Sequence, residues 1–190
     1  MGGMKELKKQ LHSYIQNPQD AYVNASLGEE YEKIGQGATA HSYFLRAAEL
    51  LYDSNPKMAY TCFLKTWKQI NTITRRPEFE KGQLQAAIIY SPHRPEAYYH
   101  LSIWYSNRKE WMTSYMYACL GKTKISNSSP LPYDVGYPGD FVFDFQLAFT
   151  GWYIGKREQS KFIFLELGKL DSIPQNFKEI IAENIRDMGL

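Results

Sequence analysis

The sequence predicts an all-α fold, a stack of antiparallel helix pairs closed by a capping helix at the carboxyl end. Three observations predict it. Prolines recur at intervals of 38, 39, 43 and 36 residues, each where a helical pattern starts. Runs with an apolar period near 3.6 residues lie between them. No Asn-Gly or Asp-Gly turn separates alternating apolar runs, so β-hairpins are not expected.

The recurring prolines mark the predicted helix starts, and they are Pro18, Pro56, Pro95, Pro138 and Pro174. Proline is favoured at the first helical position because its fixed φ suits a helix and its missing N–H is not needed there. Asn17 and Asn55 precede two of these prolines, and we expect both to cap a helix. Asp20, Glu96 and Asp140 follow in the first turn, where a negative charge complements the helix dipole.

These signals organise the 190 residues as a single repeat domain. We expect helix pairs at about 18–53, 56–91, 95–124 and 139–169, a loop at 125–138 and a capping helix at 174–188. The loop is too long for an ordinary repeat turn, and its Ser, Pro and Gly residues break helices. In the first pair, one apolar face is expected in the core, with Ala40, Phe44, Ala47, Ala48 and Leu51.

Composition excludes several classes of function. The apolar fraction is 44% and the charged fraction is 22%, which is typical of a folded chain. The net charge of +2 gives no electrostatic reason to expect nucleic acid or an anionic membrane as partner. No run approaches the ~18–20 apolar residues of a membrane span, and the amino terminus lacks a signal peptide, so we expect a cytoplasmic protein. The aromatic fraction of 15% can serve either a core or an interface.

Motifs for chemistry are missing or incomplete. The segment 35–40, GQGATA, follows a helical pattern, whereas a dinucleotide loop follows a strand. The GKT at 121–123 has Met116 where a phosphate-binding loop needs glycine. The four histidines show no metal-ligand spacing. We therefore expect no catalytic, cofactor-binding or metal-binding residue, no cofactor, and no enzyme activity. We expect Cys62 and Cys119 to be reduced core thiols, with a disulfide between them as the open alternative.

Two segments carry a family pattern of large and small residues. Residues 24–47 provide Leu27-Gly28, Tyr31, Gly35, Ala40, Phe44 and Ala47. Residues 98–121 provide Tyr98, Leu101-Ser102, Tyr105, Ser114, Ala118 and Gly121. The chain resembles the tetratricopeptide repeat (TPR) family over about residues 15–170, although its repeat is longer than the 34 residues of the family. The resemblance implies a right-handed superhelical stack whose first helices line a concave groove.

The same resemblance implies a non-catalytic protein–protein interaction scaffold that binds a peptide or protein partner in an aromatic groove. By position in the family, the candidate partner-binding residues are Tyr22, Glu29, Glu32, Arg94, Glu96, Tyr99 and Trp152. Arg94 has a structural alternative, in which it caps a helix end or pairs with Glu96. The sequence does not specify the oligomeric state.

A second resemblance covers residues 88–190. Pro92, Arg94 and Glu96 in one segment, and Trp152-Tyr153-Ile154-Gly155 in a later one, are similar to the helical repeat region attached to some family 2 glycosyltransferases. Gln146 stands where that region has an acidic residue. This resemblance implies an alternative function, an accessory module of glycan biosynthesis that binds a glycosyltransferase or a glycan.

Overall fold

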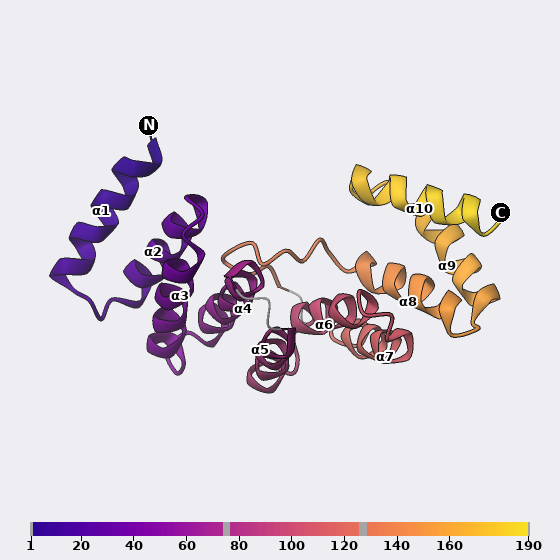
Figure 1. Cartoon of the computed structure of the whole chain (residues 1–190), viewed down its shortest axis with the longest axis horizontal. Coiled ribbons are helices and arrows are strands. Elements are labelled where there is room, and N and C mark those ends of the chain that lie inside the picture. Colours follow the sequence, from indigo (N-terminus) through magenta and orange to yellow (C-terminus); the bar gives the residue numbers. More distant parts are fainter. Residues whose placement is uncertain (1, 74–76, 126–128, 190) are drawn as a thin grey trace. The chain divides into compact units, whose positions relative to one another are not determined.

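The computed structural model describes residues 2–73, 77–125 and 129–189. Within these ranges the chain forms ten α-helices and no strand, which confirms the predicted all-α class (Figure 1). The chain divides into two compact units. Unit 1 comprises Met1–Pro92 and Ser129–Val135, and unit 2 comprises His93–Ser128 and Gly136–Leu190. None of the described helices is both long and apolar enough to cross a membrane.

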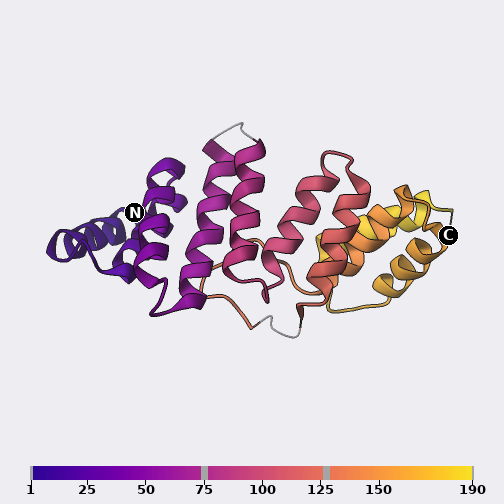
Figure 2. The same cartoon turned by 90° about the horizontal axis from the view of Figure 1, so that it is seen from below.

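Unit 1 contains the first five helices: α1 (Gly2–Gln16), α2 (Ala21–Lys33), α3 (Gly37–Leu51), α4 (Pro56–Ile73) and α5 (Pro77–Tyr90). Each helix packs on the next along the chain (Figures 1 and 2). Helix α1 was not among the helices that the sequence predicted. Its inward residues Leu7, Leu11 and Tyr14 follow the spacing of one helix face, and this signal could have identified it.

The predicted core of the first pair is confirmed, because all five apolar residues of α3 named above are buried. Gly28 on α2 is needed at its position. A Cβ atom there would lie 2.7 Å from Cδ1 of Phe44, so a larger residue would separate α2 from α3. Gly35 ends α2 with φ of +74°, a left-handed conformation that glycine adopts at low cost. The small residues therefore allow the close pair, and Phe44 fills the space between its helices.

Unit 2 contains the other five helices: α6 (Glu96–Ser106), α7 (Trp111–Lys122), α8 (Phe141–Tyr153), α9 (Arg157–Gly168) and α10 (Gln175–Asp187). Small residues again allow two helices to pack closely, here α6 and α7. The Ser114 hydroxyl donates a hydrogen bond to the Ser102 carbonyl oxygen at 2.6 Å, with both residues fully buried. Helix α10 covers α9 through Ile181, which is 1% exposed.

The prolines stand within three residues of a helix start, but only Pro56 among the five occupies the first helical position. The cap at Asn55 is confirmed, since its Oδ1 accepts from the Met58 N–H at 3.2 Å. The cap at Asn17 was wrong. Helix α2 starts later, and Asp20 caps it by accepting from the N–H groups of Tyr22 and Val23. Asn17 instead forms a turn before the helix, where its side chain accepts from the Gln19 N–H.

The segment between α7 and α8 is divided between the two units. Residues 126–128 of the predicted loop lie outside the described residues. Residues 129–135 belong to unit 1, and the orange trace in Figures 1 and 2 passes beside α4 there. Residues 136–140 belong to unit 2. Neither stretch is helical, and the backbone of the stretch that belongs to unit 1 bends at Pro132 and Tyr133.

Candidate functional site

The most distinctive surface of unit 1 joins α2 to α4. We call it the α2/α4 surface and define it by Ser26, Glu29, Glu32 and Lys65, with the fully buried Cys62 near Lys65 and Glu29. Lys65 is its centre, with only 5% of its side chain exposed. Its Nζ lies 2.6 Å from Oε2 of Glu32 and 4.0 Å from Oε1 of Glu29. A buried ammonium group thus holds two carboxylates from the neighbouring helix in place.

The charges on this surface perturb each other. Burial raises the pKa of the Glu29 carboxyl, and this effect outweighs the attraction of Lys65. Burial acts in the same direction on Glu32, but its hydrogen bonds and charge interactions with Lys65 and Lys68 leave the pKa of Glu32 below its usual value. Burial raises the pKa of the Cys62 thiol to about 12, so this thiol stays protonated and unreactive at neutral pH.

Tyr133, from the non-helical segment 129–135, packs on this surface. Its ring lies edge-on to Phe44 at 6.5 Å between centroids, and the Lys65 ammonium lies 5.9 Å from its centroid. A side-chain hydrogen bond connects Tyr133 to Ser26. Burial raises the pKa of the Tyr133 hydroxyl to about 12. The sequence analysis placed no functional residue in this loop, because nothing in the sequence says which helices a long loop covers.

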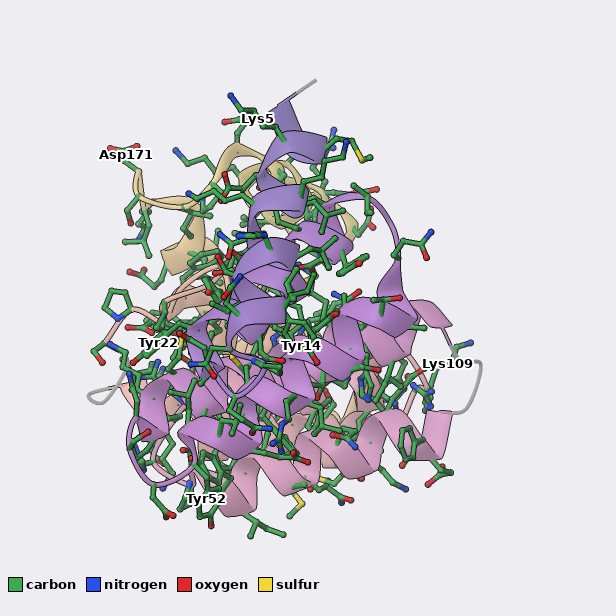
Figure 3. The ribbon with its side chains drawn as sticks, turned by 90° about the vertical axis from the view of Figure 1, so that its left-hand side faces the viewer. Lys5, Tyr14, Tyr22, Tyr52, Lys109 and Asp171 are labelled. Atoms are coloured by element: carbon green, nitrogen blue, oxygen red, sulfur yellow. The ribbon has the colours of Figure 1, made fainter. Side chains whose placement is uncertain are left out.

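Of the candidates from the first pair, Glu29 and Glu32 lie on the α2/α4 surface, and Tyr22 stands near the start of α2. Tyr22 is 55% exposed, and Figure 3 shows it near the left-hand edge of the view. Its hydroxyl accepts a hydrogen bond from Nδ2 of Asn55 at 3.1 Å. This bond connects the start of α2 to the cap of α4.

Arg94 and Glu96, in unit 2, form a buried ion pair at the start of α6. The exposed fractions of their side chains are 6% and 3%. Nε of Arg94 donates to Oε2 of Glu96 at 3.1 Å, and a terminal guanidinium nitrogen contacts the other carboxylate oxygen. The structural alternative for Arg94, pairing with Glu96, is therefore confirmed. Because the pair is buried, a partner cannot contact it directly. It can affect binding only through the residues that it positions.

Tyr99 is also buried, with 5% exposed. It packs edge-on against Tyr137 at 5.7 Å and Phe143 at 6.2 Å. Burial raises the pKa of its hydroxyl to about 12. The neighbouring Tyr137 hydroxyl donates to Oδ1 of Asp140 at 2.8 Å, and burial and this bond raise its pKa further. Tyr99 thus lies in an aromatic core that residues 136–140 help to close.

Trp152 is half-buried on α8, and the Arg157 guanidinium lies 5.3 Å from its ring centroid. It borders a small cavity of about 90 Å³ together with Tyr153, Asn184 and Asp187. Arg157 is placed to cover one face of the indole, and the ring of Tyr153 is stacked on Trp111 at 4.2 Å. The aromatic faces near this cavity are therefore largely engaged within unit 2.

Unit 1 also has an apolar surface feature that the sequence analysis missed. An apolar pocket of about 390 Å³ lies between α3, α4 and α5. Leu45, Tyr52 and Ile89 line it and are exposed by 37%, 58% and 82%. Tyr52 is labelled at the lower edge of Figure 3. Apolar residues on the outer faces of two successive second helices were the available signal.

Among the described residues, no group of three or more His, Cys, Asp or Glu side chains gathers to hold a metal ion. Cys62 is a buried free thiol of unit 1, and Cys119 is a partly buried free thiol of unit 2.

No protein-family model and no curated protein matches this chain. Several solved structures do resemble it. MamA from Desulfovibrio magneticus RS-1 is 12% identical, with a TM-score of 0.64 over 89% of this chain and 85% of that one. PilF of Pseudomonas aeruginosa is 12% identical, with a TM-score of 0.67 over 93% and 72%. A thermophilic TPR protein from Thermus thermophilus is 12% identical, with a TM-score of 0.56 over 93% and 87%. At this identity the likeness shows a TPR-like fold alone, and it gives no support to a link with glycosyltransferases.

Proposed function

We propose that this chain is a non-catalytic scaffold that binds a peptide or protein partner on the α2/α4 surface of unit 1. The observation that carries the proposal is that the non-helical segment 129–135 belongs to unit 1, with Tyr133 packed against residues of α2, α3 and α4. We expect a surface that accommodates one non-helical segment to be able to accommodate another.

The side chains of the α2/α4 surface are ordered before any partner arrives. Lys65 holds Glu32 at 2.6 Å, and Lys68 approaches the other oxygen of Glu32 at 3.3 Å. Glu29 and Glu32 keep 29% and 21% of their side chains exposed, so a partner can reach them. Because these side chains are already fixed, binding costs less conformational entropy than it would on a loose surface.

The other candidates take different parts in this proposal. Tyr22 is exposed beside the start of α2 and can extend the contact. Trp152 remains a candidate contact on unit 2. Arg94, Glu96 and Tyr99 are buried and act as supports for α6. We also propose a cytoplasmic location, which the two free thiols favour, and no enzymatic activity.

A peptide-display selection tests the proposal. We expect peptides selected on the wild-type chain to lose about tenfold or more in affinity to a Glu32→Lys variant, because reversal of a partly buried charge disrupts the surface. The control is Glu158→Lys, since Glu158 is 90% exposed on unit 2. Selected peptides that bind both variants as well as the wild type would place the binding surface elsewhere. A selection that yields no specific peptide would contradict the scaffold proposal.

The alternative, an accessory module that binds a glycosyltransferase or a glycan, has one observation in its favour. Trp152 and Tyr153 stand beside the polar groups of Asn184 and Asp187, a combination that suits sugars. However, stacking on a sugar needs an open aromatic face, and Arg157 and Trp111 already lie against these rings. We therefore rank it second. Binding to a glycan array that is lost in Trp152→Ala would reverse this order.

A further inference from the structure

We propose that segment 129–135 is an intramolecular ligand of the α2/α4 surface, and that a partner peptide of the same chemistry displaces it. The peptide class is a non-helical, proline-containing segment with a central tyrosine and an apolar residue two positions to each side. This inference rests on the function proposed above and adds the chemistry of the partner and the way in which the surface is regulated.

The segment has the burial pattern of a bound peptide. Its sequence is SPLPYDV, and alternate side chains differ in exposure. Leu131 and Tyr133 are partly buried and Val135 is only 4% exposed, whereas Pro130, Pro132 and Asp134 are exposed. The backbone bends at Pro132 and Tyr133, and Tyr133 is the residue of the segment that packs against the core formed by α2, α3 and α4. The two prolines also limit the conformations that the segment loses on binding.

The surface provides a specific place for a tyrosine. Phe44 meets the ring edge-on, and the Lys65 ammonium lies within 6 Å of its face, the range of a cation–π contact. Ser26 provides a hydrogen bond for the hydroxyl group. Phenylalanine would leave Ser26 without this bond, and a smaller apolar residue would forfeit the ring contacts as well. The arrangement therefore favours tyrosine at the central position.

A tethered ligand competes strongly with a free one. A short tether gives an effective concentration in the millimolar range, so the segment occupies the surface most of the time. The apparent affinity for a free peptide equals the intrinsic affinity multiplied by the fraction of molecules whose surface is open. Removal of the anchor should therefore raise the affinity for an added peptide without any change in the surface itself.

The test uses a fluorescent peptide with the sequence of residues 129–135 and measures its anisotropy with the full chain. We expect the Tyr133→Ala variant to bind it about tenfold or more tightly than the wild type does. A peptide with alanine in place of its tyrosine should not bind either protein. The matched control is Tyr52→Ala, which removes an exposed tyrosine of unit 1 that lies outside the α2/α4 surface, and it should behave as the wild type.

A second variant shows whether the effect of Tyr133→Ala comes from loss of the anchor or from misfolding. It replaces residues 130–133 by Gly-Ser-Gly-Ser, which keeps the length of the segment and removes its anchor. Equal affinity for all variants, or no binding to a folded variant, would overturn the inference. Unfolding of both variants, seen by circular dichroism, would show that the segment is an integral part of unit 1 and would overturn it too. If the displayed peptides nevertheless lose affinity to Glu32→Lys, the proposed function stands and only this inference fails.

Discussion

The Lys65 ammonium lies 5.9 Å from the centre of the Tyr133 ring, so an α4 side chain and a segment distant in the sequence meet on one surface. The same ammonium holds Glu32 at 2.6 Å. Lys65 is thus shared between the fold of unit 1 and the surface that we propose for binding. Its two roles can be separated, because one is measured by stability and the other by peptide affinity.

Lys65→Met should destabilise unit 1 by about 2 kcal/mol, because it leaves two partly buried carboxylates without their buried partner. Urea unfolding measures this change. Lys33→Met is the control. Lys33 pairs with Glu30 at 2.6 Å, but 62% of its side chain is exposed, so its loss should cost about 1 kcal/mol or less. Equal effects of the two variants would contradict the central role of Lys65.

Gly121→Ala should destabilise unit 2 by about 1–3 kcal/mol through overpacking. An added Cβ would lie 2.9 Å from Cβ of Tyr98 and closer still to the ring of Phe143. Gly82→Ala on α5 is the matched control, because its Cβ would meet nothing within 4 Å. That change should stabilise the chain by about 0.5–1 kcal/mol, since alanine favours helix over glycine. Thermal unfolding of both variants distinguishes a packing role for Gly121 from an unconstrained position.

Arg94→Met should cost about 3–5 kcal/mol, because it leaves the buried Glu96 carboxylate without its guanidinium partner. Glu96→Gln should also destabilise the chain, and the double variant should lose less than the sum of the two single ones. Urea unfolding of all four proteins gives the coupling energy. Strict additivity would show that the two side chains do not stabilise each other.

Stability should fall at alkaline pH. Burial raises the pKa of Tyr99 from 10.0 to about 12 in the folded state. The folded state therefore holds this proton more tightly than the unfolded state, so the stabilisation is complete below pH 10 and is lost as pH rises towards 12. Tyr99→Phe has no proton to lose and should show a smaller decrease in its urea midpoint over this range. Tyr153→Phe is the control, since Tyr153 is 53% exposed and the variant should follow the wild type.

The helix pairs could be predicted from the sequence because the apolar spacing that marks each helix is a local pattern. Ala40, Phe44 and Ala47 follow one helix face, and all three are fully buried. Helix boundaries were less predictable, since proline is tolerated at several positions around a helix start. Asp20 rather than Asn17 caps α2, because the helix begins after the turn that Pro18 opens.

The candidate site was only partly predictable. Glu29 and Glu32 lie beside Lys65 on the α2/α4 surface, and their role in partner binding stays a prediction. Tyr99 is in the core, because residues 136–140 bring Tyr137 over it, and no periodicity reveals where an extended loop packs. The place of Tyr133 depends on the same long-range packing. Contacts of this kind follow from the folded arrangement and leave no local pattern in the sequence.

Hydrogen exchange with and without a peptide selected on the wild-type chain tests the central claim most directly. The account predicts slower exchange in α2 and α4, residues 21–33 and 56–73, when the peptide is bound. It also predicts faster exchange in residues 129–135, because the peptide takes their place. Protection confined to unit 2, with residues 129–135 unchanged, would contradict the claim that the α2/α4 surface is where this chain binds its partner.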